Sequence, residues 1–266
     1  MARVFPRNVS RFFVLPELSP FIWAVIIAIA LTAGFVKGSV GFAMPMIMVS
    51  GLGSVLQPAQ AVAALILPTL VANGMQALRG GVPEAIASAK RQWRYLAVVL
   101  VMIVFSAQLV TVLPDTVLFL IIGVPVVVFA LIQLAGFRPV IAEHRRRLTE
   151  FLVGSFAGFL GGLSGVWGPP TVLYLTALNT PKAEQLRIQG IVYGLGAVVL
   201  AAAHIQSGVF NAQTAPLSAI LLLPAFLGTL AGFRVADWLN QDRFRQATLI
   251  VLVLAGLNLV RRGLMG

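Results

Sequence analysis

Long apolar runs separated by short polar segments dominate the chain. A helix that crosses a membrane needs about 20 mostly apolar residues, and the runs reach this length repeatedly. We expect spans from Phe21 into the 40s, and at Ala59–Leu78, Tyr95–Leu113, Thr116–Phe137, Leu148–Leu178, Ala183–Ser207, Ala215–Val235 and Phe244–Val260. The first and fifth runs are interrupted by glycines. The pattern predicts an all-α membrane protein with about eight transmembrane helices.

Composition agrees with a lipid environment. The chain is 59% hydrophobic and 10% charged, whereas soluble domains carry roughly 25% charged residues. A soluble fold of this length has too few interior positions to bury so much apolar surface. The chain has no cysteine and two histidines, which argues against disulfides and against thiolate or multi-histidine metal sites. We expect no cofactor and no metal.

The basic residues predict an orientation. The formal charge is +11, but the arginines and lysines cluster in short loops, which is typical of the cytoplasmic side of a membrane protein rather than of nucleic-acid binding. The loop at Pro114–Asp115 carries no lysine or arginine, so we expect it outside. Residues 1–19 are interpreted as a cytoplasmic lead-in. The sequence therefore predicts a multi-pass protein of the bacterial inner membrane with both termini cytoplasmic.

The chain repeats itself. AGFVKGSVGFAMP, which starts at Ala33, aligns without a gap to AGFLGGLSGVWGP, which starts at Ala157. Between the copies lies a strongly charged segment, RPVIAEHRRRLTE. We therefore expect two homologous repeats of four helices, at residues 20–137 and 148–266, joined by a basic cytoplasmic linker at 138–147, as in many transporters.

Each repeat predicts a broken first helix. The expected breaks are Lys37–Phe42 and Gly161–Gly168, and the structural helix starts are Pro45, Pro169 and Pro170. An interrupted helix in lipid leaves backbone groups unpaired, at several kcal/mol each, unless protein surrounds it. Proline suits the first turn of a helix. Free N–H groups around these starts predict an anion site near mid-membrane.

A packing role is the alternative for part of this glycine pattern. Gly34 and Gly38, like Gly158 and Gly162, have the spacing that lets membrane helices approach closely. For these four glycines we favour packing. For the two breaks themselves we favour a binding site, because glycine and proline cluster at matching positions in both halves.

Lys37 stands inside the first expected break. A lysine at the membrane centre costs about 2.5–3.5 kcal/mol on insertion scales and is functional by default. We see no intramembrane carboxylate to pair with it, and an anionic substrate would supply the missing charge. The alternatives are a lysine that reaches the membrane surface or one that caps the carbonyls at a helix end.

The candidate substrate-binding residues are chosen from the two breaks and from the polar residues inside the spans. Asn73 and Gln76 lie about one turn apart, and Gln189 and Tyr193 lie four apart on one helix face. Each of these four could instead serve only to hold helices together. The full set is Lys37, Gly38, Ser39, Gly41, Asn73, Gln76, Gly162, Ser164, Gly165, Trp167, Gly168, Gln189 and Tyr193.

The second motif, GGLSGVWGPPTVLYLTALNTPKAEQLR, resembles the signature of the TauE/SafE family of sulfite exporters. The first, GFVKGSVGFAMP, resembles the N-terminal counterpart in that family. The resemblance implies transport of sulfite, sulfoacetate, taurine-derived sulfonates or related anions. It places the substrate near Lys37–Pro45 and Gly161–Pro170.

Three function classes remain to be compared. We favour a secondary transporter of a small sulfur-containing anion, with a carrier or channel-like pore for another small anion as the alternative. An intramembrane enzyme lacks support, because we find no intramembrane acid pair and no HExxH motif. No GxxxxGK[ST] motif for nucleotide binding occurs. The expected partners are a small anion and the lipid bilayer. A homodimer with a second copy of the chain is kept as an open alternative.

Overall fold

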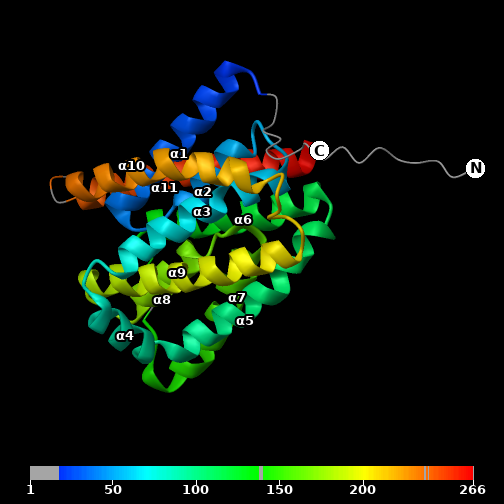
Figure 1. The fold of residues 1–266 in the computed structure, drawn as a ribbon. Helices are drawn as coiled ribbons and strands as arrows, with labels where there is room; N and C mark the ends of the chain where they lie inside the picture. The colour runs from blue at the N-terminus through cyan, green and yellow to red at the C-terminus, as the bar shows by residue number, and fades with distance from the viewer. Residues whose placement is uncertain (1–17, 138–139, 237, 239, 266) are drawn as a thin grey trace, which may run out of the picture.

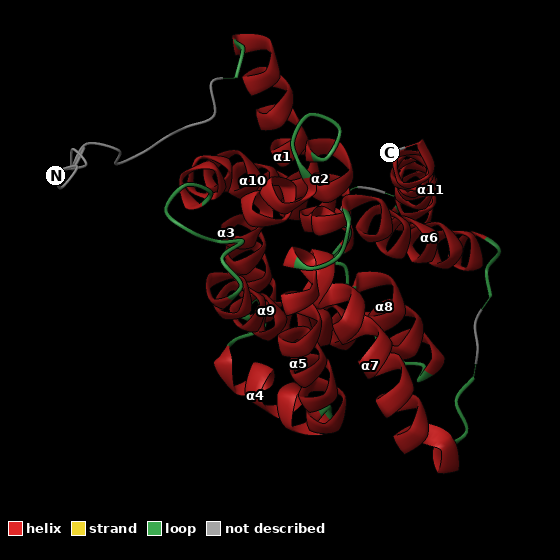
Figure 2. Ribbon diagram, turned by 90° about the vertical axis from the view of Figure 1, so that its right-hand side faces the viewer, coloured by secondary structure: helices red, strands yellow, loops and turns green. Residues whose placement is uncertain are grey.

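The chain folds into a bundle of helices (Figures 1 and 2). The structure is a computed structural model that describes residues 18–137, 140–236, 238 and 240–265, and all regular elements in these ranges are helical. The α-helices are α1 (Pro20–Val40), α2 (Met44–Leu52), α3 (Pro58–Ala77), α4 (Val82–Arg91), α5 (Trp93–Ala107), α6 (Asp115–Leu134), α7 (Arg146–Ser164), α8 (Gly168–Ala177), α9 (Lys182–Gln206), α10 (Ala215–Val235) and α11 (Gln241–Met265). Two short 3₁₀ turns, η1 (Gln108–Thr111) and η2 (Glu143–Arg145), complete the order.

Seven helices in the described ranges are long and apolar enough to cross a membrane. They are α1, α3, α5 with η1, α6, α9, α10 and α11. Of the eight predicted spans, the fifth falls on α7 and α8, and it is not among the seven. Its first turns carry Arg146, Arg147 and Glu150, which lower the hydropathy of an otherwise apolar helix. The chain is therefore a multi-pass membrane protein.

Long helices pack in four pairs. α1 lies along α10, α5 along α7, α3 along α9, and α6 along α11. Figure 1 shows the first pair at the top, α5 and α7 towards the bottom, and α3 and α9 between them. Helices far apart in sequence thus form the closest pairs, so the two halves of the chain are interleaved rather than side by side.

The short helices α2 and α8 each turn back along the helix before them. A Cβ on Gly51 near the end of α2 would face Ile29 in the middle of α1. Likewise the Tyr174 hydroxyl of α8 donates to the Glu150 carboxylate in the first turns of α7, at 3.2 Å. Each pair is a helical hairpin, and the turn of each hairpin lies inside the protein.

Glycines set the closest helix crossing. A Cβ on Gly34 or Gly38 would collide with backbone atoms of α10, and a Cβ on Gly228 or Gly232 would collide with backbone atoms of α1. The two helices therefore touch backbone to backbone. In the same way Gly158 and Gly162 lie against Val99, Ile103 and other residues of α5. The packing interpretation of Gly34, Gly38, Gly158 and Gly162 agrees with these contacts.

The structure corrects the expected grouping of charges. Arg261 and Arg262 near the C-terminus line one pocket with Asp115 and Thr116 at the start of α6. The loop at Pro114–Asp115 and the C-terminal end of α11 thus share one end of the molecule, which we call the C-terminal end. The expectation that placed that loop outside and the C-terminus inside is wrong, because α6 and α11 run antiparallel and these two helix ends meet.

The opposite end, which we call the basic end, carries most of the described arginines and lysines. It comprises the ends of α3 and α10, all of α4, and the starts of α5, α7, α9 and α11. Its arginines form contacts between these elements: Arg91 pairs with Glu184, Arg94 with Glu150, and Arg79 stacks over Phe233. The described members are Arg79, Lys90, Arg91, Arg94, Arg145, Arg146, Arg147, Arg187, Arg234 and Arg243.

Two further features belong to the basic end. Residues 82–91, between the second and third predicted spans, form the amphipathic helix α4, which has Pro83 in its first turn. Glu150, near the start of α7, is 2% exposed. It accepts hydrogen bonds from Arg94, Arg146 and Tyr174 at 2.8, 3.0 and 3.2 Å. Paired in this way, a carboxylate tolerates burial.

Candidate substrate site

Two tight turns join the helices of the two hairpins, and they are shorter than expected. α1 continues through Val40, so Lys37 is helical and only residues 41–43 are not. Similarly α7 continues through Ser164, which leaves residues 165–167. Gly41 and Gly165 end their helices in the left-handed conformation, with φ of 85° and 71°. Glycine adopts this conformation without a Cβ penalty, which is why both helices stop there.

Some of the N–H groups proposed for anion binding are already used. The Gly41 N–H donates to the Lys37 carbonyl at 2.8 Å, and the Gly165 N–H donates to the Gly161 carbonyl at 2.6 Å. These two glycines cap the preceding helices, so the expectation that their N–H groups are free is wrong. Among the first three residues of α2 and of α8, only Met44, Met46 and Gly168 have N–H groups without an acceptor in their own helix, because the other three are prolines.

Both turns line one small cavity. Residues from the first hairpin (Phe42, Ala43, Pro45) and from the second (Gly165, Val166, Trp167) face it together. A Cβ on Gly165 would lie 3.5 Å from Pro45, and one on Gly168 would lie 3.7 Å from Phe42. The complete lining is Lys37, Phe42, Ala43, Pro45, Met46, Asn73, Gly165, Val166, Trp167, Gly168 and Tyr193.

Lys37 is buried beside this cavity, at 1% exposure. Its Nζ donates to the Gly41 carbonyl at 2.9 Å and to the Gln76 side-chain carbonyl. It also lies 5.0 Å from the centre of the Tyr193 ring, within range of a cation–π interaction. The side chain does not reach the membrane surface, so that alternative is wrong, whereas the capping alternative agrees with the bond to Gly41. No carboxylate among the described residues pairs with Lys37.

Polar side chains of α3 and α9 surround the lysine. Asn73 donates to the Tyr193 backbone carbonyl at 3.2 Å, and Gln76 donates to the Leu186 carbonyl at 2.9 Å. The Gln189 side-chain oxygen is buried without a hydrogen-bond partner among the described residues. A buried polar atom without a partner is costly, and here it lies next to Gly41 and Gln76.

The aromatic residues close the other side. The Tyr193 hydroxyl donates to the Gly168 carbonyl at 3.2 Å, which holds its ring over the start of α8. The Trp167 ring stacks near it, with ring centres 6.2 Å apart. A Cβ on Gly161 would collide with the Trp167 ring. The glycine that aligns with Lys37 in the second repeat thus makes room for tryptophan.

Several predicted site residues lie away from the cavity lining. Ser39 donates to the Phe35 carbonyl at 2.9 Å, and Ser164 donates to the Leu160 carbonyl at 2.9 Å, so both hydroxyls serve their own helices. Gly38 and Gly162 pack against α10 and α5. Gly41 and Gln76 also lie outside the lining, where they accept hydrogen bonds from Lys37, and Gln189 lies next to them. Pro169 and Pro170 are buried in the first turn of α8.

The structure adds four residues that the sequence analysis did not select. Phe42, Ala43, Met46 and Val166 line the cavity. All four belong to or adjoin the two repeated motifs, and their apolar character concealed their position. Ala43 has a φ of 77°, a conformation that is uncommon outside glycine. An alanine in the sequence gives no indication of this positive φ.

The cavity is too small for an oxyanion as it stands. The cavity has a volume of about 10 Å³, enough for roughly one water molecule. A sulfur atom with three oxygens needs more room. The structure therefore has its two hairpins closed around the lysine.

The comparisons with known proteins identify the family of the chain. The family model described as "Sulfite exporter TauE/SafE" matches residues 26–259, nearly the whole chain. The chain belongs to the TauE/SafE family. No curated protein and no solved structure gives a significant match. Membership of this family makes the chain an anion-exporter-like membrane transporter, which is consistent with transport rather than catalysis as its activity.

Proposed function

We propose that this TauE/SafE protein is a secondary transporter that exports a small sulfur-containing anion, such as sulfite, sulfoacetate or another organosulfonate. The observation that carries the proposal is Lys37, a buried lysine that has no carboxylate partner among the described residues and lies at the meeting point of two helical hairpins. An anion would supply the opposite charge that the protein lacks there. A carrier or channel-like pore for another small anion is the alternative, and it uses the same site.

Binding requires Lys37 to exchange partners. Its Nζ now donates to Gly41 and Gln76, and the cavity has room for about one water molecule. An entering anion would replace the Gln76 side-chain oxygen as an acceptor of the Lys37 hydrogen bond, and that oxygen would then move away from the lysine. Rotation of the Gln76 and Gln189 amides would then present N–H donors to the anion. The closed cavity fits the occluded step of a transport cycle.

We infer that the fold consists of two inverted repeats, 20–137 and 148–266, joined by the linker at 138–147. The spacing between Ala33 and Ala157 also separates the start of α2 from that of α8, and the start of α3 from that of α9. The pairing of α1 with α10 matches that of α7 with α5, and α3 and α9 pack antiparallel on each other. Inverted repeats support alternating access by rocking of one unit against the other.

The distribution of charge suggests an orientation in a bacterial inner membrane. Cytoplasmic loops are enriched in lysine and arginine, and the basic end carries most of the described ones. We therefore infer that the basic end is cytoplasmic and the C-terminal end faces outward. This replaces the cytoplasmic C-terminus expected from the sequence. The lead-in at residues 1–17 lies outside the described residues, and a homodimer remains a prediction.

Single cysteines should report this orientation, because the chain has none of its own. Ala212 lies in the exposed loop between α9 and α10 at the C-terminal end, and Ala87 is exposed on α4 at the basic end. With a membrane-impermeant maleimide on intact cells, we expect Ala212→Cys to be labelled and Ala87→Cys to be labelled only after permeabilisation. The reverse pattern would contradict the orientation.

Replacing Gly41 with alanine should reduce transport strongly. A Cβ there would collide with Leu186 and press on Gln76 and Gln189, and the positive φ adds backbone strain. Sulfite flux in proteoliposomes should fall at least about tenfold, the effect of roughly 1.4 kcal/mol. Gly208→Ala is the matched control, because Gly208 has a φ of 79° and nothing within 4 Å of an added Cβ. An equal loss of flux in both variants would show that backbone strain, and not the site, causes the effect, and wild-type flux in Gly41→Ala would contradict the prediction.

A further inference from the structure

We propose that Arg262, with Arg261 at its side, forms a second oxyanion site at the C-terminal end, separate from the cavity around Lys37. Its ligand is a group with several negatively charged oxygens. Two sources share this chemistry: the sulfur oxyanion on its way out, and the phosphate of an anionic lipid. The first source rests on the proposed transport function, and the second does not.

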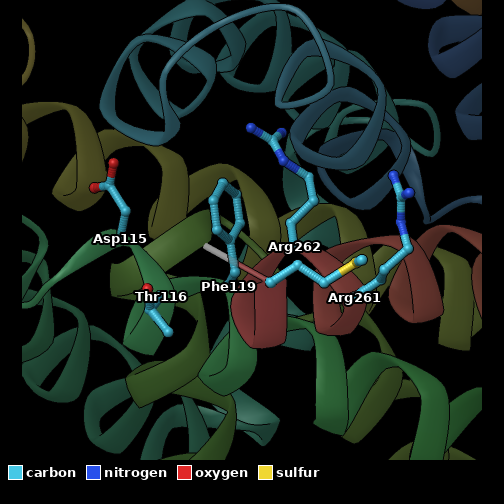
Figure 3. Close-up of a pocket in the computed structure, with 6 residues that line it drawn as sticks. Asp115, Thr116, Phe119, Arg261 and Arg262 are labelled. Carbon is cyan, nitrogen blue, oxygen red and sulfur yellow. The ribbon is translucent and has the colours of Figure 1, made fainter.

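The site is a pocket between the start of α6 and the end of α11. It has a volume of about 400 Å³, which is ample for an oxyanion. Figure 3 shows Asp115 and Thr116 on one side of Phe119 and the two arginines on the other. The lining is Asp115, Thr116, Phe119, Arg261, Arg262 and Met265.

Arg262 lacks an acceptor in this pocket. Its Nη1 is buried without a hydrogen-bond partner among the described residues, and the guanidinium lies over the Phe119 ring, 4.5 Å from its centre. Asp115 lines the same pocket, yet the described ion pairs do not include one between the two. Arg261 donates to Asn258 at 3.2 Å. A buried guanidinium nitrogen without an acceptor is costly unless a ligand completes it.

Capping of α2 does not explain Arg262. The guanidinium lies near the end of α2, since a Cβ on Gly53 would be 3.5 Å from Nη1. The carbonyls there already have donors: Val49 accepts from Gly53, Gly51 from Ser54, and Leu52 from the residues that follow. The arginine is thus left to bind something else, and the planar fork of a guanidinium matches two oxygens of one oxyanion.

The short helix α2 connects the two cationic sites. Its first turn lines the cavity beside Lys37, and Gly53, which directly follows its last residue, lies next to Arg262. A movement of α2 that opens the closed cavity would therefore also shift Gly53 relative to the Arg262 guanidinium. Three methionines of α2 are buried along its length, Met44, Met46 and Met48, and methionine adapts readily to such repacking.

The test measures binding in two lipid environments. In nanodiscs of phosphatidylcholine alone, sulfite is titrated into wild type, Arg262→Gln and Lys37→Met. In nanodiscs that also contain phosphatidylglycerol, lipid retained by each protein is counted by native mass spectrometry. We expect Arg262→Gln to weaken sulfite binding, phosphatidylglycerol binding or both by about tenfold or more. Lys37→Met should retain the binding that Arg262→Gln weakens. Arg147→Gln, at an exposed site on the basic end, is the control.

Each outcome bears on the proposal. Weaker sulfite binding by Arg262→Gln identifies the transported anion as the ligand, and loss of phosphatidylglycerol alone identifies the lipid. Unchanged binding in both arms would overturn the site. If Arg262→Gln does not fold, Arg262→Lys replaces it, and wild-type affinity in that variant would exclude a two-oxygen clamp. Absence of sulfite binding by wild type would refute the transport proposal instead. The measurement of retained phosphatidylglycerol would still test the Arg262 site.

Discussion

Lys37→Met should abolish transport of the sulfur oxyanion while the protein remains folded. The substitution keeps a long flexible side chain in the same buried space, but it removes the cation that faces the cavity. Charge-assisted hydrogen bonds contribute roughly 1.5–3 kcal/mol, so affinity should fall by about tenfold or more. Calorimetric titration with sulfite and flux into proteoliposomes measure the effect.

Two further variants make the Lys37 result specific. Lys37→Arg should retain part of the binding, although a planar guanidinium fits poorly in a pocket shaped for a point charge. Lys90→Met, at an exposed position on α4, should bind and transport as wild type does.

The capping role of Lys37 makes a different prediction. Its bond to the Gly41 carbonyl stabilises the end of α1, so a purely structural lysine would give Lys37→Met a lower melting temperature and unchanged affinity. Thermal melts and titrations on the same samples separate the two roles. Wild-type affinity in Lys37→Met would end the assignment of substrate binding to this residue.

Gly34→Ala should destabilise the whole bundle. The added Cβ would collide with the Ala225 carbonyl of α10, and neither backbone can move without disturbing the other contacts between α1 and α10. Overpacking of this kind costs about 1–3 kcal/mol. The melting temperature in detergent should fall, and the fraction of monodisperse protein should fall with it.

Gly74→Ala is the matched control for this prediction. Gly74 also lies inside a membrane-spanning helix, α3, but nothing lies within 4 Å of an added Cβ. Alanine favours the helix over glycine by roughly 1 kcal/mol, so Gly74→Ala should be neutral or slightly stabilising. If Gly34→Ala were as stable as Gly74→Ala, the α1–α10 contact would not be as tight as the structure indicates.

Local sequence patterns were sufficient for part of this protein. Apolar runs of membrane-spanning length predicted the helical membrane fold, because a span must satisfy its backbone and face lipid within a few consecutive residues. The glycine and proline motifs drew attention to the two segments in which α1 and α7 end and α2 and α8 begin. Lys37 stood out because a lysine in an apolar run is costly wherever the run lies.

Other features depend on which helices meet, and that information is spread over the whole chain. Ser39 and Ser164 bond to carbonyls of their own helices, which their place in the motifs did not reveal. The burial of Glu150 depends on Arg94 in α5 and Tyr174 in α8. Asp115 and Arg262 lie at the same end of the molecule because α6 and α11 pack antiparallel to each other. A sequence pattern records the environment of neighbours along the chain, whereas pairing between distant helices arises only when their surfaces are packed together.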